Sequence, residues 1–275
     1  MNKKIFFQSS LPRAGSTVLQ NLLAQNPQIY ATPTSGLSEL VYATHNTFSN
    51  IENFKKEKDY DLCKKSFYNF CKGGIESYYS TVTTKPIIIE KNRLWALMYP
   101  LLNKIYHNPK IIILVRDLRS IFSSFEKHYL NNPEAIYSLS SHFQDNTLPL
   151  SIYKRVEAYM KLDMVEKSLT ILQDILYSKN KNNIHIVKFE DLCSYPDKVL
   201  SEIYEYLEIP NFLHNFNKIN QVTYENDNFH SFGNHLISPT LSPPLQDWNT
   251  ILGEEISNLI YKKYDFYFKY FNYKQ

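Results

Sequence analysis

Short apolar runs alternate with helical patterns along most of the chain. Four runs have the length and composition of buried strands, and a segment with apolar residues every three or four positions follows each of them. These runs are residues 5–9, 87–89, 111–115 and 184–189. The run at 111–115 is apolar throughout, which is typical of a strand buried on both faces of a parallel sheet. The alternation predicts an α/β fold: a P-loop-type parallel sheet of four to five strands with helices on both faces.

Helices are expected between and after these strands. The predicted helical ranges are 17–25, 95–106, 118–129, 151–178, 196–207 and 254–270. Residues 37–82 form a further, mostly helical region, which the pair Gly73 and Gly74 is expected to break, because glycine weakens a helix interior. Residues 130–150 are polar and contain two prolines, and they predict a long loop that acts as a lid over the site.

Chain length and cysteine usage limit the class of protein. The 275 residues fit a single domain. The three cysteines, Cys63, Cys71 and Cys193, have no metal-ligand spacing and are too few for a disulfide framework, which favours a reducing, cytoplasmic setting. The first apolar stretch is too short for a signal peptide, and the longest apolar runs are too short for a membrane-spanning helix.

The net charge is small. Lys and Arg total 30 against 27 Asp and Glu, a net charge of +3. Nucleic-acid binding would need a concentrated basic patch, so no nucleic-acid partner is expected. The balance suits a protein with one local anion site. The aromatic segment 266–273 either packs internally or meets a partner; the sequence leaves both readings open.

A phosphate-binding loop is predicted between the first strand and the first helix, at residues 10–17 (S-L-P-R-A-G-S-T). A helix N-terminus directs backbone N–H groups and a positive dipole at an anion. Gly15 allows close approach of the backbone, and Arg13 adds a planar fork of donors. A Walker loop would need Lys after its second Gly, where Ser16 stands, so a kinase would lack its phosphate-binding lysine. The plain alternative is a capped helix after a turn.

A second anion site is predicted after the third strand. Arg116 follows this strand, at the edge of the sheet where ligands bind. Ser124 lies eight residues further, in the following helix, whose expected N-cap is Asp117. An Arg fork and a hydroxyl together suit a second phosphate. The alternative is that Arg116 pairs locally with Asp117 or Glu126.

The loop at 12–17 (P-R-A-G-S-T) resembles the P-R-S-G-[ST]-T 5′-phosphosulfate loop of sulfotransferases that use 3′-phosphoadenosine-5′-phosphosulfate (PAPS). The version with Arg is typical of tyrosylprotein sulfotransferases and many bacterial relatives. The resemblance implies that the co-substrate is bound by Pro12, Arg13, Ala14, Gly15, Ser16 and Thr17. Arg13 would contact the bridging or sulfuryl oxygens, and residues 15–17 would hold the 5′-phosphate. Ala14 replaces the usual Ser, which removes one donor and leaves the backbone cradle.

The same resemblance extends to the later strand ends. It assigns Arg116 and Ser124 to the 3′-phosphate, and it assigns Lys91 to the sulfuryl group or the leaving phosphate. Arg93 stands where some members have a catalytic His, and a guanidinium cannot accept a proton near neutral pH. Phe189, in the segment V-K-F-E-D-L, matches an aromatic residue that contacts adenine, or is a core Phe.

No residue is clearly the general base. In the tyrosylprotein branch a Glu follows the first helix; here Thr34 falls closest to its position, and Glu39 nearby is the first candidate. An exposed helical Glu is the alternative reading. His45 and Glu90 are further candidates, although side chains alternate along a strand, so Glu90 should face away from Lys91 and form a structural ion pair.

The resemblance implies a single sulfotransferase domain over 1–275, with a helical insert at about 37–82 and a nucleotide-covering region at about 210–250. His235, in that region, is either a site residue or a solvated loop His. The implied reaction is in-line transfer of the sulfuryl group from PAPS to a hydroxyl or amine of an unidentified small molecule, carbohydrate or peptide Tyr. No metal is expected, because Arg13 and Lys91 supply the positive charge. A non-catalytic sulfotransferase-like protein and a P-loop nucleotide kinase remain alternatives.

Overall fold

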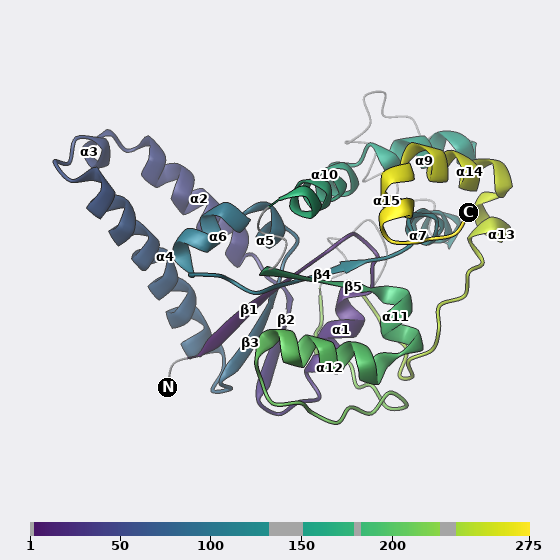
Figure 1. Ribbon diagram of the computed structural model, residues 1–275, viewed down its shortest axis with the longest axis horizontal. Coiled ribbons are helices and arrows are strands. Elements are labelled where there is room, and N and C mark those ends of the chain that lie inside the picture. Colours follow the sequence, from purple (N-terminus) through teal and green to yellow (C-terminus); the bar gives the residue numbers. More distant parts are fainter. Residues whose placement is uncertain (1–2, 132–150, 179–182, 226–234) are drawn as a thin grey trace.

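Five parallel strands form the centre of the fold in the computed structural model (Figure 1). The structure describes residues 3–131, 151–178, 183–225 and 235–275. The strands are β1 (Lys4–Ser10), β2 (Ile29–Thr34), β3 (Ile87–Lys91), β4 (Ile111–Val115) and β5 (Ile184–Lys188). Their order in the sheet is β2-β3-β1-β4-β5, and all neighbours are parallel. The predicted α/β class and parallel sheet are therefore confirmed.

Strand β2 is the one that the apolar pattern did not predict. Its sequence, I-Y-A-T-P-T, contains Pro33 and two threonines, and its pairing with β3 is irregular between Ala31 and Thr34. It lies at the edge of the sheet, where a strand needs partners on one side alone. An edge position tolerates proline and polar residues that a central strand would exclude.

Helices cover both faces of the sheet, with α1 and α12 on one side and α6 and α10 on the other (Figure 1). The helices are α1 (Ser16–Leu23), α2 (Leu37–Asn50), α3 (Glu52–Lys55), α4 (Tyr60–Val82), α5 (Leu94–Leu97), α6 (Tyr99–Ile105), α7 (Leu118–Asn131), α9 (Ile152–Met160), α10 (Asp163–Tyr177), α11 (Phe189–Ser194), α12 (Pro196–Leu207), α13 (Trp248–Leu252), α14 (Glu254–Lys263) and α15 (Asp265–Tyr270). Helices α2, α3 and α4 form an arm that extends away from the sheet (Figure 1).

The expected break at Gly73 and Gly74 is wrong, because α4 runs through both glycines. Its buried residues, Phe67, Cys71, Ile75 and Tyr79, recur every four positions. Burial of this stripe stabilises the helix by more than two glycines cost, at about 1 kcal/mol each.

Three predicted helices are divided. The helix expected at 254–270 becomes α14 and α15, which Tyr264 separates. The helix expected at 151–178 is broken at Leu162, whose backbone is extended and whose side chain is buried, so that α10 starts afresh at Asp163. The helix expected at 95–106 becomes α5 and α6, because Pro100 occupies the first turn of a new helix.

The loop predicted at 130–150 falls mostly outside the described residues. In the part of the chain that the structure describes, no helix is long and apolar enough to cross a membrane.

Candidate active site

Three neighbouring strands bring the predicted site segments together. Strand β1 lies between β3 and β4, and its carboxyl end leads into the loop that contains Arg13 and Gly15. Lys91 is the last residue of β3, and Arg116 follows the last residue of β4. Because the strands are parallel, all three segments lie at one edge of the sheet. The sequence pattern predicted these residues at strand ends, and the structure places those ends side by side.

The loop after β1 depends on two residues in the left-handed backbone region. Arg13 has φ 56° and Gly15 has φ 84°. A Cβ on Gly15 would lie 2.2 Å from the Phe189 ring, so position 15 requires glycine both for its backbone and for space. Gly15 is the N-cap of α1, and no side-chain hydrogen bond caps this helix. Ala14 is buried, 1% exposed, so its side chain faces the core.

Two adjoining cavities lie over this loop. The first has a volume of about 520 Å³, and the cations Arg13, Lys91 and Arg116 line it together with Gly15 and Glu39. The second, of about 400 Å³, contains Ser124 in its wall. The two cavities share five lining residues: Val18, Arg116, Phe189, Leu236 and Ile237. Arg116 and Phe189 therefore lie at the boundary between them.

Arg116 connects the two predicted anion sites. Its Nη1 donates to the carbonyl oxygen of Arg13 at 3.0 Å, and its guanidinium lies 4.8 Å from the centre of the Phe189 ring. The Nε of Arg13 donates to the hydroxyl of Ser124 at 3.1 Å. The Nε of Arg116 is buried and has no hydrogen-bond partner within the described ranges. This orphaned donor is what an absent anionic ligand would leave.

The alternative that Arg116 pairs with a neighbouring acid is wrong. The carboxylate of Asp117 accepts from Nε and Nη2 of Arg119, at 3.0 and 2.6 Å. The carboxylate of Glu126 accepts from Arg155 in a buried ion pair. Each of the two acids thus has another arginine as its partner. Within the described ranges, Arg116 forms no ion pair with either of them, although Glu190 and Asp117 act electrostatically on its guanidinium.

The C-terminal aromatic residues form the support behind Arg116. The hydroxyl of Tyr267 accepts from the backbone N–H of Arg116 at 3.2 Å and donates to its carbonyl at 2.7 Å. Tyr273 donates to Glu190 at 2.8 Å, and Glu190 also accepts from the backbone N–H of Asp117 at 3.0 Å. Both tyrosines are buried. The segment 266–273 therefore packs internally through Tyr267, Phe268, Phe271 and Tyr273, whereas Tyr270 is exposed. Glu190 of the predicted motif fixes the turn after β4.

Lys91 has a partner that the sequence did not reveal. Its ammonium donates to the hydroxyl of Thr17 at 3.2 Å and forms a buried ion pair with Glu225. Glu225 also accepts from the backbone N–H and hydroxyl of Thr34, at 3.2 and 2.9 Å. His235 Nε2 lies 3.4 Å from the same carboxylate, so His235 is at the site. Burial acts to raise the pKa of Glu225, but Lys91 and His235 outweigh it and hold that pKa at about 2.

Glu90 has surroundings different from those of Lys91. It is fully buried and accepts from Ser35 and from the indole N–H of Trp95 at 3.3 Å. Burial raises its pKa to about 7, although the hydrogen bonds from Ser35 and Trp95 act to lower it. The ion pair predicted for Glu90 is wrong: its partners among the residues that the structure describes are neutral.

The other two candidates for the general base are in different places. Glu39 lines the first cavity, and its carboxylate accepts from Asn92 Nδ2 at 3.2 and 3.3 Å and from Ser38 at 2.8 Å. His45 lies further along α2, and its ring is 6.0 Å from that of Phe67 on α4. Neither cavity has His45 in its lining. Geometry therefore favours Glu39 over His45.

Comparisons with known proteins identify relatives for this arrangement. The sulfotransferase family matches the sequence over residues 6–213. The structure is similar to the sulfotransferase domain of the Synechococcus PCC 7002 olefin synthase, with a TM-score of 0.50 and 18% identity over 96% of this chain and 94% of that one. It is also similar to the sulfotransferase domain from the curacin biosynthetic pathway, with a TM-score of 0.52 and 17% identity over 96% and 98%. At such identities the likeness shows the fold alone. No curated protein matches the sequence significantly.

Proposed function

Because the chain belongs to the sulfotransferase family, we propose that it transfers the sulfuryl group of PAPS to an acceptor hydroxyl or amine. One observation carries this proposal. The segment 10–17 and Arg116, the candidates for anion binding, follow the adjacent strands β1 and β4, and Arg116 and Phe189 line both of the adjoining cavities. A ligand with phosphates at both ends of one nucleoside would fill both sites.

The residues present fit such a nucleotide. The glycine at position 15 and the uncapped start of α1 offer backbone N–H groups to the 5′-phosphate. The orphaned Nε of Arg116 and the hydroxyl of Ser124 offer donors to the 3′-phosphate. The Phe189 ring lines both cavities and is the proposed contact of the adenine. Within the described ranges no group of side chains suits a metal ion, and the proposal does not require one.

The bound co-substrate would supply the reactive sulfuryl group and depart as 3′,5′-adenosine bisphosphate. In an in-line displacement, negative charge grows on the oxygen that bridges the sulfuryl group and the 5′-phosphate. Arg13 and Lys91 line the cavity where that charge would develop, and fixed cations there stabilise the transition state more than the ground state. The buried ion pair with Glu225 positions the Lys91 ammonium, which also donates to Thr17.

The acceptor must lose a proton as it attacks sulfur, and Glu39 is the proposed acceptor of that proton. Its carboxylate lies in the wall of the first cavity, held by the amide of Asn92, the residue next to Lys91. Glu39 and the Lys91 cation therefore line the same cavity. Arg93 also lines this cavity but remains protonated, so it serves binding rather than proton transfer.

A transfer assay tests the proposal. The full chain is incubated with radiolabelled PAPS and pools of hydroxyl- and amine-bearing acceptors, and label in the acceptor fraction is measured against an Arg13→Ala control. We expect label transfer that the variant lacks. Tight binding of the bisphosphate with no transfer to any pool would instead indicate a non-catalytic protein. Thermal stabilisation by Mg-ATP, and none by the bisphosphate, would indicate a nucleotide kinase.

A further inference from the structure

One face of α7 forms a wall of the second cavity. Ser120, Ser124 and Lys127 lie at positions i, i+4 and i+7 of this helix, and all three line the cavity. Arg116, immediately before the helix, lines it as well. Residues with this spacing lie above one another on a helix surface. The cavity therefore has two cations, Arg116 and Lys127, with serine hydroxyls between them.

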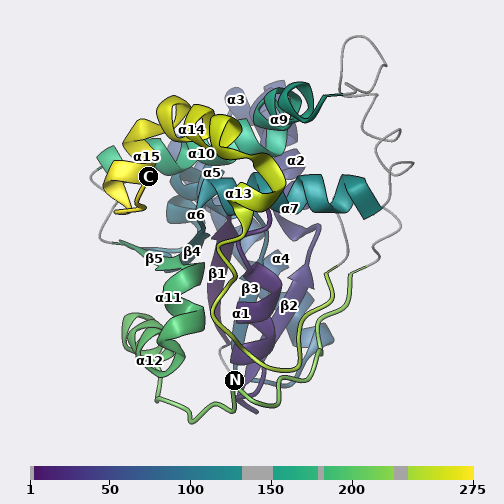
Figure 2. The same ribbon diagram turned by 90° about the vertical axis from the view of Figure 1, so that its right-hand side faces the viewer.

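The segment opposite α7 supplies no cation. From Ile219 to Tyr261 the sequence contains neither Lys nor Arg. The described part of this segment lines the second cavity with apolar residues, hydroxyls and one acid, Asp247, and its helix α13 packs against α7 (Figure 2). Of the described residues that line this cavity, Arg116 and Lys127 are therefore the cations, and Arg13 lies beside it, with its Nε 3.1 Å from the Ser124 hydroxyl. Arg116 provides one charge, while a phosphate monoester carries between one and two negative charges near neutral pH.

A solvent-exposed ion pair with Asp247 holds Lys127 at this cavity. Its ammonium lies 2.6 Å from the carboxylate of Asp247, and the two side chains are 43% and 39% exposed. Ion pairs this exposed are weak, because water and salt screen them. A phosphate that also contacts Arg116 and the serine hydroxyls offers Lys127 a stronger partner in the same cavity.

We propose that Lys127 is the second cation of the 3′-phosphate site and the residue that gives preference for a 3′-phosphorylated nucleotide. Asp247 holds Lys127 until the nucleotide binds, and then the ammonium passes from the carboxylate to the phosphate. The inference rests on the proposed function, because it takes the ligand of this cavity to be the 3′-phosphate end of PAPS.

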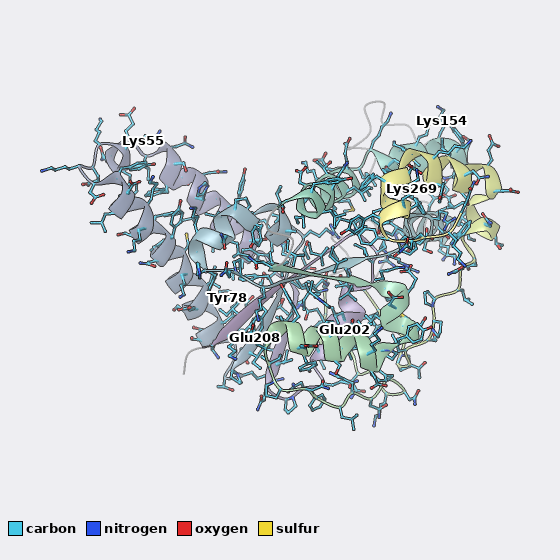
Figure 3. All side chains as sticks on the ribbon, viewed as in Figure 1. Lys55, Tyr78, Lys154, Glu202, Glu208 and Lys269 are labelled. Carbon is cyan, nitrogen blue, oxygen red and sulfur yellow. The ribbon has the colours of Figure 1, made fainter. Side chains whose placement is uncertain are left out.

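The test is calorimetric titration of the full chain with two nucleotides, 3′,5′-adenosine bisphosphate and 5′-AMP. The variants are Lys127→Met, which keeps the length of the side chain, and Asp247→Asn, which releases Lys127. Lys154→Met is the matched control, since Lys154 is exposed on α9 (Figure 3) and has a similar ion pair with Glu157. Circular dichroism of each variant checks that it is folded.

For Lys127→Met we expect bisphosphate affinity to fall about tenfold, with 5′-AMP affinity unchanged within about twofold. For Asp247→Asn we expect bisphosphate affinity to rise by up to about fivefold, and the Lys154 control should leave both affinities unchanged. Equal effects of Lys127→Met on both nucleotides, or no effect on either, would overturn the inference while leaving the proposed function intact. A wild-type chain that binds neither nucleotide would overturn the proposed function itself.

Discussion

Substitution of Gly15 by Ala tests how closely the phosphate loop and the Phe189 ring depend on each other. The added Cβ would lie 2.2 and 2.3 Å from two carbons of the ring, so the ring must move. The backbone at φ 84° costs an alanine about 1 kcal/mol. Displacing the ring also weakens its cation–π contact with Arg116. This adds about 0.5–1 kcal/mol to the loss in the free energy of unfolding.

Together these effects predict a loss of about 2 kcal/mol in the free energy of unfolding. For a chain of this size, that loss lowers Tm by roughly 4–8 °C. Thermal denaturation of Gly15→Ala is compared with that of Gly36→Ala, because Gly36 has no neighbouring atom within 4 Å of an added Cβ and no positive φ. The bisphosphate should also bind the Gly15 variant at least about tenfold more weakly, since the cradle and Phe189 move together.

A double-mutant cycle separates the two causes. When Phe189→Ala is already present, Gly15→Ala should cost about 1 kcal/mol, because the backbone strain remains and the overlap is gone. A cost of Gly15→Ala no larger than that of Gly36→Ala would refute both causes. Equal costs of Gly15→Ala with and without the Phe189 ring would show that the ring is not the obstacle.

Three further predictions concern turnover, affinity and pH. Arg13→Ala should lower kcat by at least about tenfold with a smaller change in bisphosphate affinity, whereas Arg116→Ala should mainly weaken that affinity; steady-state kinetics and calorimetry measure the two. Glu39→Gln should lower kcat with bisphosphate affinity unchanged, and His45→Gln should change neither. Glu90→Gln should gain stability relative to wild type by about 2 kcal/mol between pH 5 and 8 in urea denaturation, because the folded-state pKa of Glu90 is about 7.

The sign of the pH effect follows from the direction of the shift. As pH rises above about 4.5, the unfolded chain releases the Glu90 proton while the folded chain keeps it up to about pH 7, so wild-type stability falls over this range. A stability difference between wild type and Glu90→Gln that stays constant with pH would contradict the prediction.

If Arg13→Ala mainly weakened bisphosphate affinity and Arg116→Ala mainly lowered kcat, the two phosphates would be assigned to the wrong loops. Equal losses of kcat in the Glu39 and His45 variants would exclude Glu39 as the base.

The sequence predicted the central part of the fold and the positions of the candidate site segments at the strand ends. Those features depend on local signals: apolar runs for buried strands, and Gly15 or Arg116 directly after a strand. Strand β2 escaped prediction because an edge strand needs no continuous apolar run, and Pro33 is acceptable there. The helix through Gly73 and Gly74 escaped because tertiary packing outweighs local propensity.

Local sequence patterns could not predict the ion-pair partners of Lys91 and Lys127. Glu225 lies 134 residues from Lys91, in a segment with no regular structure, and no motif marks it. Asp247 lies 120 residues from Lys127. Ion pairs of this kind arise from the folding of the chain over the sheet edge, so they appear once the three-dimensional arrangement is known. The same reason explains why Ser35 and Trp95 are the partners of Glu90, which was expected to face away from Lys91 and to form a structural ion pair.

The claim that one nucleotide spans both anion sites is tested most directly by a crystal structure of the chain with 3′,5′-adenosine bisphosphate. The 5′-phosphate should contact the backbone at residues 15–17, and the 3′-phosphate should contact Arg116 and Ser124, with the adenine on Phe189. A bisphosphate bound elsewhere, with Arg13 and Arg116 both facing solvent, would contradict the account.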